Sequence, residues 1–381
     1  MRAMILAAGL GTRLYPITKK TPKCMLPVVN KPVIERAIEN LKNHHINDVI
    51  INIHQSESGL QTEEYLGTGS KFGINIAYSE EETLLGTAGG VKKASWFFDP
   101  ETTIILSGDG VFNLNITEFV EVHHERRGLA TINLSYIYDT SQYGVVVVDD
   151  NWRIKRFQEK PKPGEAQSNL VNTGIYAFER KIFDLIPDGE YDFGKELFPR
   201  LLKENIPFYG YYSEMYWNDI GTIDVFRQVH MDILMKKVNL PIPGKETRPG
   251  INVGINTYID EDAELIPPVA IGNNVIIERY ARLKGPLSIA DSCRIEENVY
   301  IEKSIVLPGV FIGKGSEIKN AVIGGGARIL QGVTLTDNNI IGPSSIIGEY
   351  STLAGGIKID ADVDVPGKSE LRKDVMMEEN G

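Results

Sequence analysis

An aliphatic residue recurs at every sixth position after residue 250, and this repeat constrains the fold more than any other feature of the chain. The repeat runs without interruption from Val253 to Ile301, and its phase then slips between residues 302 and 322. It resumes at Ile323 and continues to Val365. Hexapeptide repeats of this kind specify a left-handed parallel β-helix, because each turn stacks its aliphatic residue on the previous one. Chance alternation in an irregular β domain would not sustain so long a run.

The N-terminal part of the chain has a different pattern, in which strand-like apolar runs alternate with helical stretches. The runs that we expect to form strands are 4–7, 48–53, 74–78, 103–106 and 131–136, and residues 33–43 are expected to form a helix. Strands interleaved with helices imply a mostly parallel, Rossmann-like sheet that is covered on both faces. We therefore predict an α/β fold followed by a left-handed β-helix, with ligands at the carboxyl ends of the strands.

The two patterns give an expected domain organisation. It consists of an N-terminal domain over residues 1–231, a proline-containing linker over 232–250, the β-helix over 251–366, and a charged tail over 367–381 that frays. A β-helix has exposed edges and flat faces, so we expect a homo-oligomer formed through it.

Composition excludes several classes of protein. The net charge of −11 discourages a nucleic-acid partner, because phosphate backbones favour basic faces. The sequence contains no apolar run long enough to cross a membrane. Its first residues form only a short apolar run, so we expect them to be a buried strand and not a signal peptide. Cys24 and Cys293 are too few and too far apart for a disulfide framework or a metal cluster. These features predict a cytoplasmic protein without a membrane partner.

A glycine-rich loop follows the first expected strand directly. Gly9 and Gly11 allow the backbone to approach a ligand closely, and their N–H groups can cradle phosphate oxygens. Arg13 supplies a planar fork for phosphate, and Lys23 adds a mobile positive charge. The spacing matches neither the dinucleotide-binding fingerprint nor the Walker motif. The loop therefore predicts phosphate binding of another kind.

Two aspartates are candidate metal ligands. Asp109 follows the apolar run 103–106, and Asp219 lies in a tight turn between Trp217 and Gly221. Two carboxylates can hold Mg²⁺, which keeps several waters and shares phosphate oxygens. A turn-forming role for each aspartate is the alternative.

The loop leads to a family resemblance that covers nearly the whole chain. Residues 6–27 resemble the signature of the sugar-phosphate nucleotidyltransferases, with Ala8 at the first glycine position and Ile17 in place of leucine. Further matches are the segments Leu85–Gly90, Ser107–Asp109, Phe157–Pro161, Val171–Gly174 and Trp217–Thr222. Ile223 stands where the family often has proline. A C-terminal β-helix is also common in this family.

The resemblance implies an enzyme that joins a nucleotide to a sugar 1-phosphate and releases pyrophosphate, with Mg²⁺ on Asp109 and Asp219. The catalytic residues that it implies are Arg13, Lys23, Asp109 and Lys160. The implied nucleotide contacts are Leu6, Ala8, Gly9, Gly11, Thr12, Arg13, Lys23, Glu80, Glu81, Gly86, Thr87, Gly108 and Asp109. The implied sugar-phosphate contacts are Gly144, Glu159, Lys160, Asn172 and Asp219. For Glu159 and Lys160, a solvated charge pair is the alternative.

The acidic run 80–82 bears on the choice of nucleotide. Guanine presents two adjacent donors that a carboxylate can accept, whereas uracil and thymine present flanking carbonyls. An acid just before Leu85–Gly89 is similar to the mannose-1-phosphate guanylyltransferases. We therefore favour GTP and mannose 1-phosphate. An exposed acidic turn is the alternative, and uridylyl-, thymidylyl- and adenylyltransferases acting on glucose 1-phosphate remain open.

Two other classes of protein are less consistent with the sequence. A non-catalytic regulatory subunit would have a degenerate nucleotide pocket, but Arg13, Lys23, Asp109, Lys160 and Asp219 are all present. A bifunctional acyltransferase would need a histidine base in the β-helix, and no histidine follows His230. We therefore expect the β-helix to serve assembly or regulation.

Overall fold

The structure is a computed structural model that describes residues 1–98 and 102–377. The chain packs into two compact units, and each unit combines two segments of the sequence. The first unit contains residues 1–9 and 33–219, and the second contains residues 10–32 together with the chain from 220 onward. The second unit thus takes in a segment that the sequence assigned to the N-terminal domain.

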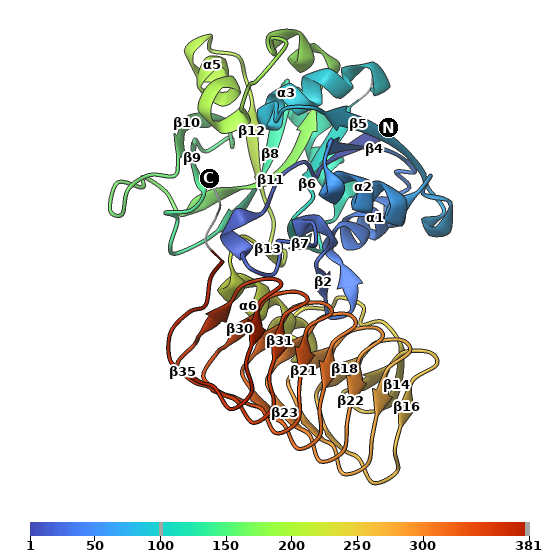
Figure 1. Cartoon of the computed structure of the whole chain (residues 1–381). Coiled ribbons are helices and arrows are strands. Elements are labelled where there is room, and N and C mark those ends of the chain that lie inside the picture. Colours follow the sequence, from blue (N-terminus) through green and yellow to red (C-terminus); the bar gives the residue numbers. More distant parts are fainter. Residues whose placement is uncertain (99–101, 378–381) are drawn as a thin grey trace. The chain divides into compact units, whose positions relative to one another are not determined.

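The first unit is built on one mixed sheet, whose main path runs β10-β9-β11-β6-β1-β4-β5, with β8 and β12 attached through β11 (Figure 1). Its strands are β1 (Arg2–Leu6), β4 (Asp48–His54), β5 (Asn75–Glu81), β6 (Thr103–Ser107), β8 (Ala130–Tyr136), β9 (Gly144–Val148), β10 (Ile154–Glu159), β11 (Leu170–Phe178) and β12 (Tyr209–Tyr212). Strand β1 pairs in parallel with β4 and β6, whereas β11 pairs in antiparallel fashion with β6, β8 and β9. The predicted α/β fold class is confirmed, and each of the five expected strands corresponds to a strand of this sheet.

Helices pack on this sheet through apolar faces. In the first unit they are α1 (Val33–Asn43), α2 (Glu57–Leu66), α3 (Gly86–Lys93), α4 (Ile116–Arg126) and α5 (Phe198–Lys203). Helix α1 shows why: its buried residues include Ile34, Ile38 and Leu41, which share one face at helical spacing. A separate antiparallel ribbon joins β7 (Gly110–Phe112) and β13 (Trp217–Asp219). Within the described ranges, no helix combines the length and the apolar character that a membrane crossing needs.

The second unit contains a parallel β-helix made of three sheets (Figure 1). The first sheet consists of β14 (Lys245–Arg248), β15 (Ile251–Val253), β18 (Val269–Ile271), β21 (Leu287–Ile289), β24 (Ile305–Val306), β27 (Val322–Ile323), β30 (Ile340–Ile341) and β33 (Lys358–Ile359). The second consists of β16 (Tyr258–Ile259), β19 (Ile276–Ile277), β22 (Arg294–Ile295), β25 (Phe311–Ile312), β28 (Arg328–Ile329), β31 (Ile346–Ile347) and β34 (Asp364–Val365). The third consists of β17 (Glu264–Ile266), β20 (Arg282–Lys284), β23 (Tyr300–Glu302), β26 (Glu317–Lys319), β29 (Thr334–Leu335), β32 (Thr352–Leu353) and β35 (Glu370–Leu371).

The phase slip in the sequence leaves the core of the β-helix continuous. Ile289 pairs with Val306, which in turn pairs with Ile323, so both steps along the first sheet are shortened to 17 residues. Val306, Ile312 and Ile318 fill the aliphatic columns through the segment where the sixfold spacing is lost. The shortening therefore falls at the corners between strands, and the stacking of buried side chains is preserved.

The strands of the β-helix extend past residue 366, which was its expected end. Leu371 of β35 pairs with Leu353, and Val375 forms a bridge with Ile359. The expected linker also contains regular structure, because α6 (Ile223–Leu234) extends into it and β14 pairs in antiparallel fashion with β15.

Cys24 and Cys293 are both buried as free thiols.

The segment 10–32 contacts the β-helix within the second unit. Lys19 Nζ donates to Asp360 Oδ2 at 2.7 Å, and Lys20 forms an ion pair with Asp362. Ser288 Oγ donates to the side-chain oxygen of Asn30 at 3.1 Å. The segment ends in a short hairpin of β2 (Pro27–Val28) and β3 (Lys31–Pro32).

The stacked aliphatic columns of the β-helix predict that two neighbouring residues of β19 contribute very differently to stability. Ile277 is fully buried in its column, whereas Ile276 points outward and is 38% exposed. We expect Ile277→Ala to lower the free energy of unfolding by about 2–5 kcal/mol, through lost burial and an unfilled cavity. The matched variant Ile276→Ala should cost roughly 0.5 kcal/mol or less. Denaturant titration measures both, and equal costs would contradict the assignment of the columns.

Candidate active site

Strands β1 and β6 end at the same level and so define one edge of the sheet, and β4 beside them continues to His54. Leu6 at the end of β1 is in register with Asn52 of β4 and with Ser107 of β6. The segments that follow β1 and β6 carry Ala8, Gly9 and Asp109. In parallel sheets, ligands bind in the crevice outside the carboxyl ends of the strands. The two segments that carry these predicted site residues therefore both start at the same edge of the sheet.

A buried hydrogen-bond network connects the segments at this edge. The side-chain oxygen of Asn52 accepts from Ala7 N at 2.8 Å, and its amide nitrogen donates to Glu81 Oε1 at 2.7 Å. Glu81 Oε2 accepts from Leu85 N at 3.0 Å. Asn52 and Glu81 are both almost fully buried. The network fixes the start of the glycine-rich loop to the segment that leads into α3. Sequence reasoning missed Asn52, although a polar residue inside the apolar run 48–53 was a signal.

The structure separates the three acids of the run 80–82. Glu81 points inward, and each of its oxygens has a protein donor. Glu80 is exposed and accepts from Gln55 Nε2 at 2.8 Å, and Glu82 is exposed as well. Glu81 therefore acts as a structural acceptor in this conformation. Its two neighbours are exposed, with Glu80 in β5 and Glu82 in the bend that follows this strand.

The first turn of α3 is capped by a loop of the same unit. Thr87 Oγ1 donates to Asp192 Oδ2 at 3.0 Å and accepts from Phe193 N at 2.9 Å. The amides of Ala88 and Gly89 both donate to Tyr191 O at 2.9 Å. The donors of this turn and the hydroxyl of Thr87 thus hold the loop around Tyr191, a role that the sequence did not indicate.

Gly108 shows why the turn after β6 needs a residue without a side chain. Its amide donates to Leu6 O at 2.8 Å, and a Cβ at this position would lie 2.7 Å from the same oxygen. The turn therefore closes tightly against the end of β1. Ser107 Oγ donates to Asp109 Oδ1 and orients that carboxylate.

The ribbon of β7 and β13 brings the two predicted metal ligands together along the backbone. Asp219 is in register with Gly110, the residue directly after Asp109. Among the residues that the structure describes, no group of three or more potential metal ligands is found. A pair of carboxylates nevertheless fits Mg²⁺, because this ion is usually held by one or two carboxylates, with waters and substrate phosphates completing its shell.

Three of the predicted sugar-phosphate residues lie on the hairpin of β9 and β10. Gly144 is in register with Glu159, and Lys160 follows the end of β10 with its amide donating to Tyr143 O at 3.1 Å. Lys160 Nζ lies 3.8 Å from Glu159 Oε1. Burial raises the pKa of Glu159, and the positive charge of Lys160 opposes this shift. The Lys160 side chain is 57% exposed, so its ammonium is accessible to an anionic ligand.

Asn172 lies at an irregularity of β11 that packs against the end of β6. Its amide donates to Tyr176 OH at 2.9 Å, and its side-chain oxygen accepts from Gly174 N at 3.0 Å. Gly174 has a φ of +76°, and a Cβ there would lie 3.0 Å from Ser107 Cβ. The bulge thus re-aims the strand beside Ser107, as bulges next to active sites often do.

The remainder of the glycine-rich loop lies in the second unit. Gly11 has a φ of +66°, and a Cβ at this position would lie 2.8 Å from Lys23 Cβ. Thr18 Oγ1 donates to Gly11 O at 2.9 Å. Lys23 is largely buried, whereas Thr12 and Arg13 are exposed. The loop is therefore folded on itself, with Lys23 packed against Gly11 and the Arg13 guanidinium accessible.

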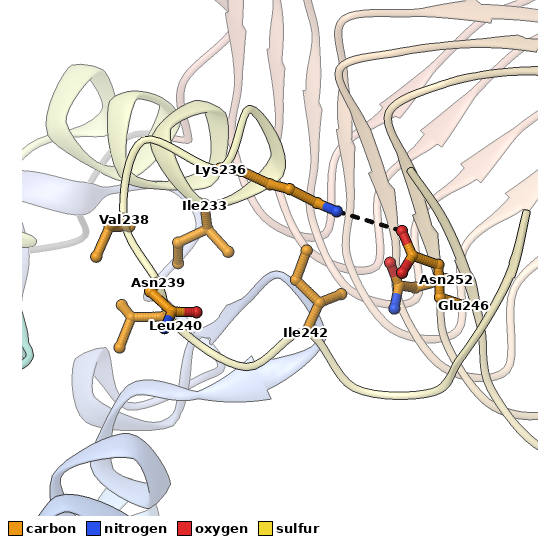
Figure 2. A pocket seen from close by; sticks show the side chains of 8 residues that line it. All are labelled: Ile233, Lys236, Val238, Asn239, Leu240, Ile242, Glu246 and Asn252. Atoms are coloured by element: carbon orange, nitrogen blue, oxygen red, sulfur yellow. Dashed lines mark hydrogen bonds and ion pairs between the residues drawn. The ribbon is translucent and has the colours of Figure 1, made fainter. Parts of the chain in front are cut away.

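The second unit also contains a hollow of about 440 Å³ that includes none of the predicted site residues (Figure 2). Its lining consists of Ile233, Lys236, Val238, Asn239, Leu240, Ile242, Glu246 and Asn252. Lys236 Nζ forms an ion pair with Glu246 at 3.3 Å. The aliphatic residues here come from the end of α6 and from the connection to the β-helix.

Comparison with known families assigns most of the N-terminal part of the chain to one family. Residues 2–236 match the model of the nucleotidyl transferase family. The chain belongs to this family. Residues 248–379 match the model of the GMPPB C-terminal domain, which covers the β-helix.

Related proteins that are named for different nucleotides align with most of this chain. A UTP–glucose-1-phosphate uridylyltransferase of Synechocystis sp. is 39% identical over 90% of this chain and 87% of its own. A mannose-1-phosphate guanyltransferase of Gibberella zeae is 29% identical over 96% of this chain and 99% of its own. A Bacillus anthracis crystal structure named for glucose-1-phosphate thymidylyltransferase superposes with a TM-score of 0.57 at 29% identity, over 63% of this chain and 97% of its own.

The contacts of Glu81 predict a structural effect that its neighbour lacks. In Glu81→Gln, one amide oxygen replaces two carboxylate oxygens, and the new NH₂ group faces a backbone donor. We expect the free energy of unfolding to fall by about 1–3 kcal/mol. The exposed control Glu82→Gln should change it by roughly 0.5 kcal/mol or less. Denaturant titration measures the difference, and a fully stable Glu81→Gln protein would refute the structural role.

Proposed function

We propose that this chain transfers the uridylyl group of UTP to glucose 1-phosphate, giving UDP-glucose and pyrophosphate. The observation that carries the proposal is the 39% identity to the Synechocystis uridylyltransferase over 90% of the chain, which includes both units. The commitment of Glu81 to Asn52 and Leu85 adds support, because it removes one candidate acceptor for guanine.

The reaction needs positioning more than acid–base chemistry. An oxygen of the sugar phosphate attacks the α-phosphorus of the triphosphate. The bond between the α-phosphorus and the oxygen that bridges it to the β-phosphorus breaks, and pyrophosphate leaves from the opposite side. The attacking oxygen is already anionic, so no general base is required. The work of the enzyme is then to hold two anions in line and to stabilise the charge of the transition state.

The glycine-rich loop is suited to the triphosphate. The exposed Gly9 has no atom within 4 Å of the space where a Cβ would lie, so its backbone is open to a ligand. The exposed guanidinium of Arg13 can pair with phosphate oxygens through its planar fork. In this proposal Lys23 neutralises charge as the pyrophosphate departs.

The β9–β10 hairpin and the β11 bulge are suited to the sugar phosphate. Lys160 would bind the incoming phosphate and reduce its repulsion from the triphosphate. Glu159 accepts hydrogen bonds and Asn172 both donates and accepts them, which fits sugar hydroxyls. Gly144, in register with Glu159, would offer backbone contacts.

Asp109 and Asp219 would hold Mg²⁺. When bound there, the ion would neutralise phosphate charge and polarise the α-phosphate. Ser107 supports Asp109 in this role through its hydroxyl, which keeps one carboxylate oxygen oriented.

GTP with mannose 1-phosphate is the second candidate pair. It is supported by the match of residues 248–379 to the GMPPB C-terminal domain and by the nearly full-length relative from Gibberella zeae. Glu80 and Glu82 remain exposed carboxylates just before Leu85. The sequence favoured this pair on the acidic run as a whole, and we rank it second because Glu81 is committed to the protein.

A substrate grid tests the proposal directly. The protein is incubated with Mg²⁺, with UTP, GTP, dTTP, ATP or CTP, and with glucose, mannose, galactose or N-acetylglucosamine 1-phosphate, and pyrophosphate release is measured. We expect the fastest release with UTP and glucose 1-phosphate. Fastest release with GTP and mannose 1-phosphate would replace the proposed specificity by the second candidate. Release with no pair would overturn the proposed activity.

The carboxylate pair predicts a selective loss of turnover. Asp109→Asn removes a charge that the metal needs, and we expect kcat to fall by about 10²-fold or more with an unchanged melting temperature. Asp150→Asn, on the exposed surface of the same unit, is the control and should keep full activity. Normal turnover in Asp109→Asn would reject the metal assignment.

A further inference from the structure

The loop proposed to bind the triphosphate is held by a buried carboxylate of the β-helix. Asp360 follows the last residue of β33 and is fully buried. Lys19 reaches it from the segment 10–32, and the Lys19 side chain is 23% exposed. Ion pairs with a buried partner are screened less by solvent and salt than surface pairs are. This contact is therefore a stronger constraint on the loop than an ordinary surface pair.

Both oxygens of the Asp360 carboxylate accept hydrogen bonds, two from backbone amides and one from Lys19. Ala361 N donates to Oδ1 at 2.8 Å, and Met377 N donates to Oδ2 at 3.0 Å. Lys19 Nζ supplies the third donor at 2.7 Å. Burial would raise the pKa of Asp360, but the hydrogen bonds from Lys19 and the two amides hold this pKa below its ordinary value. The carboxylate is thus charged at neutral pH, and Lys19 is its counterion.

The same stretch of chain reaches the phosphate-binding part of the loop. Thr18, directly before Lys19, donates its hydroxyl to Gly11 O at 2.9 Å. The Lys19 ammonium also lies over the ring of Tyr15, 5.4 Å from its centre. Tyr15 directly follows the short 3-10 turn that contains Arg13. Adjacent residues therefore contact the β-helix on one side and the loop that carries Gly11 and Arg13 on the other.

A neighbouring ion pair provides an internal comparison. Lys20 pairs with Asp362, but both of these side chains are well exposed, at 43% and 53%. Exposed pairs constrain a chain weakly, because water and salt screen them and the long side chains lose entropy. The two pairs join the same segment to the same part of the β-helix and differ chiefly in burial.

We propose that Lys19 is a positioning residue for nucleotidyl transfer, which acts by anchoring the glycine-rich loop to Asp360 of the β-helix. The proposal rests on the function proposed above for Gly11, Arg13 and Lys23. The β-helix then contributes to binding of the triphosphate by fixing the conformation of this loop. The proposed sugar-phosphate residues belong to the first unit, so their binding does not depend on the anchor.

The test uses full-length Lys19→Met with Lys20→Met as the matched control. Both changes remove one ammonium from the same loop and keep a long apolar side chain. With UTP and glucose 1-phosphate, we expect kcat/KM for the nucleotide to fall by about 10²-fold in Lys19→Met, because a small displacement of a binding group has effects of this size. The KM for the sugar phosphate should stay within about twofold, and Lys20→Met should resemble the wild type.

A second variant separates positioning from stability. Lys19→Met leaves the buried Asp360 carboxylate without its counterion, which destabilises the fold. Lys19→Met with Asp360→Asn removes both charges, although the new NH₂ group then faces one of the two amide donors, Ala361 N or Met377 N. We expect the double variant to regain part of the thermal stability that Lys19→Met loses, while its nucleotide kcat/KM stays low. Lys19→Arg keeps the ion pair and should restore most of the nucleotide kcat/KM.

Three results would overturn the inference. One is a Lys19→Met enzyme as active as Lys20→Met, and another is a double variant that regains nucleotide kcat/KM together with stability. The third is an equal change in KM for both substrates. If the unaltered protein released no pyrophosphate with any substrate pair, the proposed function would fail first and this inference would fail with it.

Discussion

The parallel pairing of β1 between β4 and β6 is the constraint on which the site of the first unit depends. A central parallel strand takes its register from both neighbours, and here that register places Leu6 level with Asn52 and Ser107. The tight approach of Gly108 to Leu6 and the reach of Asn52 to Ala7 and Glu81 both require this level alignment. A shift of one residue would turn every side chain of β1 to the other face of the sheet.

Much of this architecture could be predicted from the sequence, because its patterns are strong and local. The sixfold aliphatic repeat specified the columns of the β-helix, and the alternating apolar runs specified the strands around β1. The antiparallel half of the sheet could not be foreseen, since the apolar residues of β11 do not reveal which strands they pair with. The grouping of residues 10–32 with the β-helix was hidden for the same reason. It depends on contacts such as Lys19 with Asp360, which join residues 341 positions apart.

The candidate site shows the same limit at the level of single residues. The sequence singled out the run 80–82 as chemically interesting, but composition does not tell which carboxylate points inward. That direction is set by the pleat of β5 and by the hydrogen-bond partner on the buried side, which is Asn52. The partners of Thr87 and of the α3 amides lie about a hundred residues further along the chain, around Tyr191 and Asp192. Spacing motifs identify which residues are available for chemistry, and tertiary contacts decide which of them are already engaged.

The anchor between Lys19 and Asp360 also has a consequence for the order in which the protein is made. Lys19 is synthesised well before its partner, which follows 341 residues later. At about 5–20 residues per second, this interval is roughly 20–70 s. During that time the sheet around β1 can form, but the glycine-rich loop has no carboxylate to dock on. A nascent or prematurely terminated chain that lacks Asp360 would therefore hold an unanchored loop, and the anchor forms only after this coil of the β-helix has been made.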